Sequence, residues 1–270
     1  NLMRAESPGP SVSKLVPKVQ STAKILYTIY FGMTLIQLAL LLIGRVPLFD
    51  SLCITFGTAG TGGFGIVNDS LGSYSTYCQV VTTIFMILFG VNFSAYYLIL
   101  TKKFRQAFKY EEVRYYFGII AVAIVIIALN TVHLFRNLLT AFQQAAFQVG
   151  SIITTTGFSS TDFNQWPALS KTVLVLLMFV GACAGSTGGG IKVSRILILY
   201  KAAKKEFQLY LHPNAVKKIK MDDKVITHDI LRSTNIYISL YLMIFATSVL
   251  LIAIDNFDLI TNFMAVTATL

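Results

Sequence analysis

Two short loops rich in threonine and glycine contain the residues of this chain whose types and spacing could do chemistry. TGGFGIVND occupies residues 61–69 and TTGFSSTDF occupies residues 155–163, so Thr, Gly and Phe recur at a constant offset of 94. Each block follows a segment that can form a short helix, at 50–58 and at about 137–150, and Asp50 is the one charged residue in the two segments. Recurrence at a fixed offset indicates an internal repeat, and we therefore expect the two loops to serve the same chemistry.

That chemistry is the binding of a cation by uncharged oxygens. A threonine–glycine strand offers successive carbonyl and hydroxyl oxygens, and several such strands around one axis can replace the hydration shell of an ion. A helix that ends just before the loop directs its partly negative carboxyl end toward the same point. Mg²⁺ and Ca²⁺ would require carboxylates, which the threonine–glycine runs lack, so we expect a weakly hydrated monovalent cation. The predicted ligands are Thr61, Gly62, Gly63, Thr155, Thr156 and Gly157.

Glycine-mediated helix packing is the alternative interpretation of these loops. It accounts for the glycines, but it does not account for the three adjacent threonines at 154–156. Glycine suits an ion-binding strand because it can turn its carbonyl toward the axis without a clash at Cβ. The ion-binding interpretation is therefore favoured, and Gly157 is expected to adopt a backbone shape that a side chain would obstruct.

A second glycine-rich stretch, GACAGSTGGGIKVSR at 181–195, interrupts a segment that should cross a membrane. Each glycine in a helix interior costs about 1 kcal/mol relative to alanine, so the stretch predicts a break between helices at 170–180 and roughly 191–205. It is not a Walker phosphate-binding loop, because Ile191 separates the last glycine from the lysine. We expect a movable barrier, a gate, formed by Gly185, Ser186, Thr187, Gly188, Gly189, Gly190 and Lys192.

Two expectations accompany the gate. The equivalent segment of the first copy, 86–100, has a single glycine and is expected to remain one continuous helix, so that only one copy is broken. Lys192, the charge nearest to the break, either repels a passing cation or extends its ammonium group toward the cytoplasm, and the second role is favoured.

The elements that position these loops are membrane helices. Hydrophobic residues make up 55% of the 270 residues and charged residues 13%, and the mean hydropathy is +0.67. Soluble domains carry about 25% charged residues. Five charge-free windows each hold roughly the 20 residues that a membrane-spanning helix needs. They lie between Lys24 and Arg45, Asp69 and Lys102, Arg114 and Arg136, Lys171 and Lys192, and Arg232 and Asp255. The chain is therefore expected to be an all-α polytopic membrane protein.

The net charge of +10 is distributed as expected for a membrane topology, and not as expected for a nucleic-acid-binding site. Lysines and arginines gather before the first window, at 102–114 and at 195–232, whereas aspartates predominate in the other connections. This asymmetry is the positive-inside pattern, and it assigns the basic segments to the cytoplasm. No aromatic–basic module supports nucleic-acid binding. The stretches 102–114 and 201–232 would either dock a regulatory partner or contact anionic lipid.

The sequence indicates neither an enzyme nor a resident cofactor. Cys53, Cys78 and Cys183 form no C-x-x-C pair and the three histidines are scattered, so neither a disulfide framework nor a zinc site is expected. Paired carboxylates and a nucleophile with a neighbouring base are also missing from the pattern. The expected ion is therefore transported cargo.

The repeat divides the chain into units. Residues 25–101 and 115–205 are each expected to form a span, a short helix, a loop and a second span, and 233–270 begins a third copy. The third copy is indicated because FDLITNFMAVTAT at 257–269 matches FDSLCITFGTAGT at 49–61. The connections at 1–24, 102–114 and 206–232 are expected to be cytoplasmic linkers. Since two complete loops cannot close a ring, we expect the chain to be part of a longer protein.

Four motifs resemble the Trk/Ktr/HKT family of potassium transporters, with the bacterial TrkH/TrkG type the most similar. They are RAESPGPSVSKLVPK, TAGTGGFGIVNDS, SIITTTGFSSTDFNQWP and GACAGSTGGGIKVSRIL. The resemblance implies four joined span–pore helix–filter loop–span units around a pseudo-fourfold pore, of which this chain holds the second, the third and the start of the fourth. It also implies potassium uptake across the bacterial cytoplasmic membrane, with K⁺ as the transported ion.

The same resemblance implies a homodimer that binds a cytoplasmic, nucleotide-sensing regulatory ring of the TrkA/KtrA kind. The alternative function is an ion-coupled secondary transporter of a small solute, with its broken helices forming the binding site. Competition of rubidium uptake by alkali cations, rather than by organic solutes, would favour potassium transport.

Overall fold

The computed structural model describes residues 19–107, 109–135, 137–212 and 218–270, which are predominantly helical. The chain divides into two compact units, one ending at Val193 and the other beginning at Ser194. Every predicted filter and gate residue lies in the first unit. The RAESPGPSVSKLVPK motif, which fills most of the predicted linker 1–24, lies outside the described residues.

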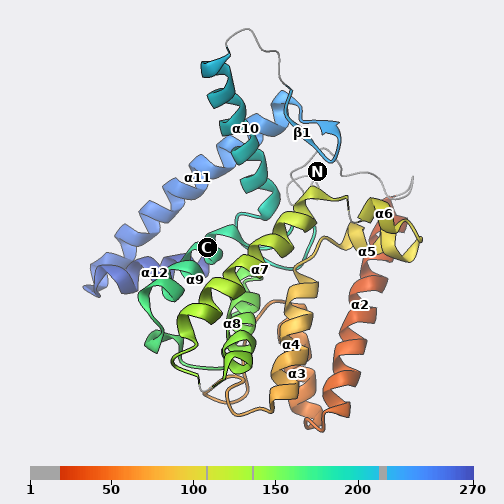
Figure 1. The fold of residues 1–270 in the computed structure, drawn as a ribbon, viewed down its shortest axis with the longest axis vertical. Helices are drawn as coiled ribbons and strands as arrows, with labels where there is room; N and C mark the ends of the chain where they lie inside the picture. The colour runs from red at the N-terminus through yellow and green to blue at the C-terminus, as the bar shows by residue number, and fades with distance from the viewer. Residues whose placement is uncertain (1–18, 108, 136, 213–217) are drawn as a thin grey trace. The chain divides into compact units, whose positions relative to one another are not determined.

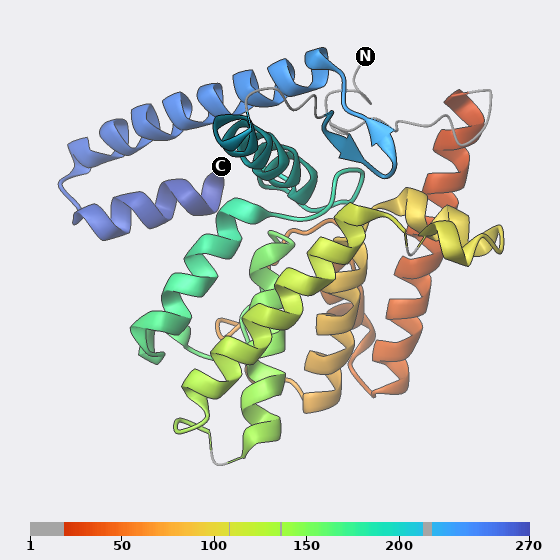
Figure 2. The same cartoon turned by 45° about the horizontal axis from the view of Figure 1, so that its top comes forward.

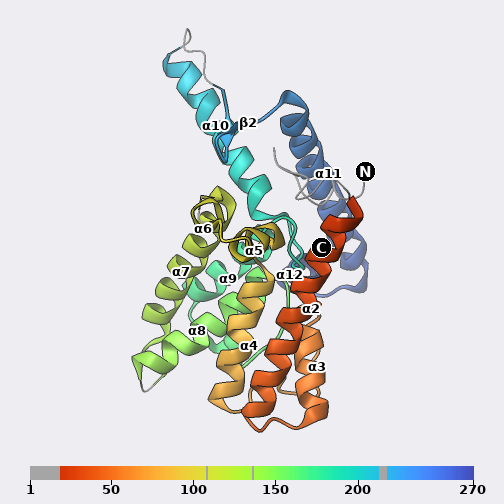
Figure 3. The ribbon, with the colours of Figure 1, turned by 90° about the vertical axis from the view of Figure 1, so that its right-hand side faces the viewer.

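The first unit is a bundle of helices. They are α2 (Val19–Ile43), α3 (Leu48–Ala59), α4 (Thr76–Phe89), α5 (Phe93–Leu100), α6 (Phe104–Ala107), α7 (Glu111–Thr131), α8 (Leu138–Ile153), a 3₁₀ turn (Phe163–Gln165) and α9 (Ala168–Val180). The helices α2, α3 and α4 contact one another, and α7 packs along α8, which also contacts α4 (Figures 1 and 3). The predicted short helices at 50–58 and 137–150 are confirmed as α3 and α8.

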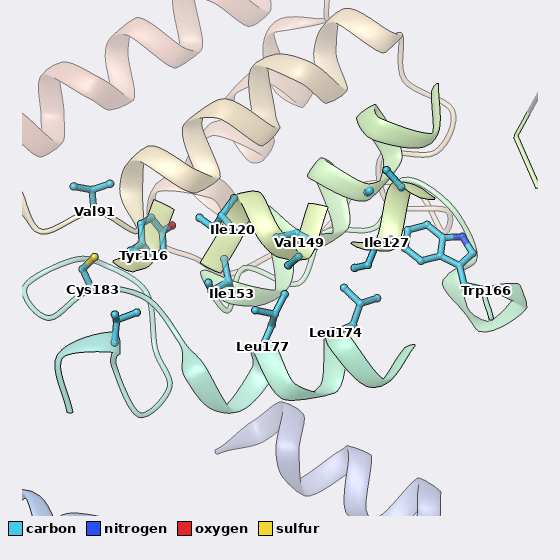
Figure 4. Close-up of a cluster of buried hydrophobic side chains, with 14 of the residues drawn as sticks. Val91, Tyr116, Ile120, Ile127, Val149, Ile153, Trp166, Leu174, Leu177 and Cys183 are labelled. Atoms are coloured by element: carbon cyan, nitrogen blue, oxygen red, sulfur yellow. The ribbon is translucent and has the colours of Figure 1, made fainter. Parts of the chain in front are cut away.

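Two clusters of buried apolar side chains hold this bundle together. One joins α2, α3 and α4, and includes Leu41, Ile54 and Phe89. The other joins α7, α8 and α9, where Leu174 and Leu177 of α9 face Val149 and Ile153 of α8 (Figure 4). The sole tryptophan of the chain, Trp166, closes one end of this second cluster, with its ring edge-on to that of Phe135.

The second unit contains α10 (Val193–Leu211), a two-residue hairpin of β1 (Lys220–Met221) and β2 (Lys224–Val225), α11 (His228–Ile252), a 3₁₀ turn (Ala253–Asp255) and α12 (Leu259–Thr269). The helix α12 folds back along α11 (Figure 2), where the rings of Phe245 and Phe263 lie 5.1 Å apart. The hairpin is a small addition to the expected all-α fold. It also makes the predicted linker 206–232 shorter, since α10 continues to Leu211 and α11 already begins at His228.

The expected membrane protein is confirmed, but with fewer continuous spans than the five predicted. Among the described residues, three helices are long and apolar enough to cross a membrane, at Ala23–Ile43, Glu111–Thr131 and His228–Asp255. The helices α4 and α5 add a fourth span if they are counted together, although they are bent by 94°. The window 171–192 is not one helix, because α9 has only 13 residues. That is about 20 Å of helix, which is short of a bilayer core.

Candidate functional site

The two threonine–glycine loops begin in the same way, directly after α3 and α8. The first threonine of each loop has a left-handed backbone, with φ of 51° at Thr61 and 56° at Thr155. This conformation is uncommon for a β-branched residue. Each loop then reaches a glycine with positive φ, 66° at Gly63 and 93° at Gly157. Both loops therefore leave their helix with the same reversal of the chain.

The hydrogen bonds of the two loops also correspond at the offset of 94. The amides of Gly62 and Gly63 both donate to the carbonyl of Gly57, at 2.7 and 3.3 Å. The amides of residues 156 and 157 likewise both donate to the carbonyl of Ser151, at 2.9 and 3.3 Å. The last turn of each short helix thus fixes the following loop, which explains why a helix must precede each threonine–glycine run.

Gly63 and Gly157, which are equivalent at the offset of 94, have different surroundings. A Cβ atom on Gly63 would lie 1.9 Å from the carbonyl oxygen of Thr156, so the two loops meet backbone to backbone at this point. A Cβ atom on Gly157 would meet nothing within 4 Å. Among the described residues, therefore, no helix packs closely against Gly157. The expected obstruction there comes from its positive φ alone, and steric crowding is found at Gly63 instead.

The second loop is also held by the elements around the first. The ring of Phe158, only 1% exposed, reaches Gly57 in α3, where an added Cβ would lie 2.9 Å from the ring tip. The carbonyl of Ser159 accepts a bond from the Leu71 amide at 2.8 Å. The ring of Phe64, the equivalent of Phe158 in the first loop, is 85% exposed.

The oxygen atoms of the loops fall into two groups. The threonine hydroxyls are engaged inside the protein: those of Thr154 and Thr156 bond each other at 2.7 Å, and that of Thr154 also donates to a helix carbonyl. The backbone carbonyls of 61–63 and 155–157 are different, because no described residue donates a hydrogen bond to them. The two loops therefore contain six neutral oxygens that accept no hydrogen bond from the described residues.

The predicted break, between a helix ending at 180 and one beginning at roughly 191, is confirmed, because α9 ends at Val180 and α10 begins at Val193. The predicted continuous helix at 86–100 is wrong, since α4 ends at Phe89 and α5 begins at Phe93 after the sharp bend. Gly90 marks the break, and Asn92 restarts the helix by accepting a bond from the Ser94 amide at 2.9 Å.

The break between α4 and α5 and the break between α9 and α10 satisfy each other's backbone hydrogen bonds. This is the physical reason why the helix at 86–100 can be interrupted. The amide of Cys183 donates to Gly90 O at 3.0 Å, and the amide of Phe93 donates to Gly185 O at 3.0 Å. The side chain of Tyr116 adds a bond to Ile87 O at 3.0 Å. Irregular backbone is tolerated at membrane depth only where the protein satisfies its polar groups. Val91, Tyr116 and Cys183 lie together at this junction (Figure 4).

The glycine-rich segment 181–192, which contains the predicted gate residues Gly185–Gly190 and Lys192, also contacts both threonine–glycine loops. The hydroxyl of Thr61 donates to Thr187 O at 3.2 Å, and the hydroxyl of Thr155 accepts from the Gly189 amide at 2.7 Å. These two threonines are equivalent at the offset of 94. The structure therefore brings the predicted filter and gate residues together at one place.

Lys192 has a contact within the glycine-rich segment. Its half-buried side chain donates a hydrogen bond to the carbonyl of Gly188. This bond braces the glycine run internally, and the two roles considered from the sequence, repulsion of a passing cation and extension toward the cytoplasm, stay predictions.

Sequence reasoning missed one acidic residue at this site. Glu112, in the first turn of α7, is 3% exposed, and its carboxylate accepts a 2.6 Å bond from the amide of Ala184. An acidic residue at the start of a helix is ordinary, since it stabilises the positive end of the helix dipole. Only the strength of the surrounding apolar pattern could have signalled that this carboxylate is buried.

Comparisons with known proteins identify the family. Residues 1–270 match the TrkH family, described as a cation transport protein. The chain is 35% identical to the "Trk system potassium uptake protein TrkH" of Salmonella typhimurium and 33% identical to that of Escherichia coli K12, each over 100% of this chain and 57% of the relative. The crystal structure of the potassium transporter TrkH from Vibrio parahaemolyticus matches with a TM-score of 0.90 at 30% identity, over 99% of this chain and 58% of that one.

The chain therefore spans little more than half the length of the relatives that it matches. The family match and the described spans agree with the expected multi-pass membrane protein of the bacterial cytoplasmic membrane. Three of the four motifs that suggested the family lie within the described residues, in a fold shared with a solved member. The chain belongs to the TrkH family of cation transport proteins.

Proposed function

We propose that this chain is part of the pore-forming membrane subunit of a potassium uptake system, with K⁺ as the transported ion. The observation that supports this most is the set of six carbonyl oxygens at 61–63 and 155–157, to which no described residue donates a hydrogen bond. Rings of such oxygens can replace the hydration shell of K⁺. The compared TrkH relatives are named as potassium uptake proteins, which supports the same cargo.

The proposed filter residues are Thr61, Gly62, Gly63, Thr155, Thr156 and Gly157, acting through their carbonyl groups. Their hydroxyls are less suitable ligands, because those of Thr61, Thr155 and Thr156 are already bonded within the protein. The helices α3 and α8 end at Ala59 and Ile153, and the negative ends of their dipoles favour a cation in front of them.

The proposed gate is Gly185–Gly190 with Lys192. Its contacts with Thr61 and Thr155 support a position next to the filter, where it would obstruct an ion that had passed the carbonyls. We expect deletion of 185–190 to raise potassium flux and to weaken dependence on a regulatory partner. Because Thr155 loses a partner in that deletion, a modest change in preference among alkali cations is also expected. Loss of flux in assembled protein would instead assign a structural role to the segment.

The remaining parts of the proposal concern the intact protein. Since the chain covers 57% of its relatives, we propose that 25–101 and 115–205 are the second and third of four units and that 233–270 begins the fourth. Further filter strands would then complete the ring. We also propose a homodimer with a cytoplasmic nucleotide-sensing ring, and no enzymatic activity.

Rubidium uptake tests the proposed function. The intact protein would be expressed in potassium-starved cells that lack their own uptake systems, and initial rates of rubidium uptake would be measured with competitors. We expect K⁺ to compete strongly and organic solutes to have no effect. Competition by an amino acid or sugar, with K⁺ ineffective, would support the solute transporter and overturn the proposal.

A further inference from the structure

Glu112 is a buried acidic residue that the proposed filter and gate do not use. Its side chain is 3% exposed, and its carboxylate lies 2.6 Å from the amide nitrogen of Ala184. A buried carboxylate is costly unless hydrogen bonds compensate it, and a bond from an amide to an ionised acceptor is stronger than a neutral one. The contact therefore connects α7 firmly to the gate segment, 72 residues further along the chain.

The neighbours of Ala184 show what this contact holds. Cys183 and Gly185, on either side of it, bond to Gly90 and Phe93 at the break between α4 and α5. Those bonds join backbone to backbone, so almost any sequence could form them. The bond to Glu112 requires a carboxylate, or another acceptor of similar reach. Three consecutive residues are thus anchored, and only the middle anchor depends on a side chain.

The other end of the segment faces the filter. Thr187 and Gly189 bond to Thr61 and Thr155, while Lys192 bonds back to Gly188. The segment is therefore fixed at 183–185 by the scaffold. At 187–189 it is fixed by the filter loops and by Phe89 O at the end of α4, which accepts bonds from the amide and the hydroxyl of Thr187 at 3.4 and 3.3 Å. Among these contacts with the rest of the bundle, the bond to Glu112 involves an acidic side chain.

We propose that Glu112 is a positioning residue that holds the 181–192 segment in its closed position through Ala184. This inference rests on the proposed function, because it assigns Glu112 to the gate of that pore. Removal of the carboxylate should loosen 183–185, which would then keep only the two backbone bonds to Gly90 and Phe93. The segment should shift toward an open position without any change to the six filter carbonyls. Transport should become faster while the apparent affinity for the ion stays the same.

The test compares Glu112→Ala and Glu112→Gln with the adjacent acidic control Glu111→Ala, all in the intact protein. Hydrogen–deuterium exchange of a peptide covering 183–187 would be measured in purified protein, together with rubidium uptake per assembled protein in cells. We expect roughly tenfold faster exchange for Glu112→Ala, from the strength of a charge-assisted bond, and an intermediate rate for Glu112→Gln, which keeps an oxygen acceptor. The control should exchange like the wild type.

Uptake by Glu112→Ala should reach up to about tenfold the wild-type maximal rate, with less than about a twofold change in half-saturating concentration. In protein that already lacks 185–190, the same substitution should add nothing, because two changes in one mechanism are not additive. Unchanged exchange, or an effect that persists in the deletion, would overturn the inference.

The two proposals fail in different ways. If the wild type takes up no rubidium, the proposed function fails, and the exchange rate still decides whether Glu112 positions the segment. If the wild type transports and Glu112→Ala exchanges and transports as the wild type does, only the role of Glu112 fails. Should Glu112→Ala not assemble, the nearly isosteric Glu112→Gln carries the same comparison.

Discussion

The loops at 60–65 and 154–159 follow the same backbone path in different surroundings. Local bonds to Gly57 and Ser151 set that path, and they are the same in both copies. The surroundings differ because the second loop lies against the elements of the first: Phe158 is 1% exposed, whereas Phe64 is 85% exposed. The backbone conformation of each loop is therefore set within its own copy of the repeat. How well a loop residue tolerates substitution depends on its contacts with the neighbouring copy.

The glycines of the two loops also share a backbone conformation but differ in their surroundings. Gly63 combines a positive φ with contact against the carbonyl of Thr156, whereas Gly157 has a positive φ and open space. Gly62 has neither restriction, since an added Cβ would make only ordinary contacts, 3.6 Å from the Phe64 ring and 4.0 Å from the Cα atom of Gly57. The three positions should therefore respond to substitution in a definite order.

The largest effect is expected for Gly63→Ala. Its left-handed backbone adds a strain of about 1–3 kcal/mol, and the clash with Thr156 O adds overpacking of about 1–3 kcal/mol. Rubidium uptake per assembled protein should fall more than tenfold. The matched control Gly62→Ala should transport nearly as the wild type does. Equal behaviour of the two variants would mean that the loops do not meet at Gly63.

A smaller effect, on stability rather than on ion binding, is expected for Phe158→Ala. Removal of a buried aromatic ring costs about 3–5 kcal/mol, so the midpoint of thermal unfolding in detergent should fall clearly. Phe64→Ala should change that midpoint much less. An equal loss from Phe64→Ala would break the comparison, since it would indicate that the intact protein covers Phe64 as α3 covers Phe158.

The smallest effect is expected for Gly157→Ser. Because there is room for the side chain, only the backbone strain of about 1–3 kcal/mol remains. We expect assembly to be intact and the apparent affinity for potassium to be lower by roughly fivefold or more, measured as the half-saturating concentration for uptake. An unchanged affinity would remove Gly157 from the filter.

The parts of the site that could be predicted from the sequence are those encoded locally. Irregular backbone is indicated within a few residues by the threonine–glycine runs after α3 and α8, and by the glycines at 181–190. The break at Gly90 was missed because a single glycine inside a long helical pattern is usually tolerated. Its stability depends on Cys183 and Gly185, more than 90 residues away. Glu112 was missed for the same reason, since its partner Ala184 lies 72 residues further on.

Because of its surroundings, alkylation of the Cys183 thiol would report movement of the 181–192 segment. Its thiol is 0% exposed and sits beside Ala184, so an alkylating reagent can reach it only after 183–185 have moved. Cys78 is equally buried, but in the cluster around α2–α4, and Cys53 is half-buried in α3. Cys78 would therefore report unfolding, and Cys53 general access. The ratio of modification at Cys183 to that at Cys78, read by peptide mass, converts gate opening into a reaction rate that needs no ion gradient.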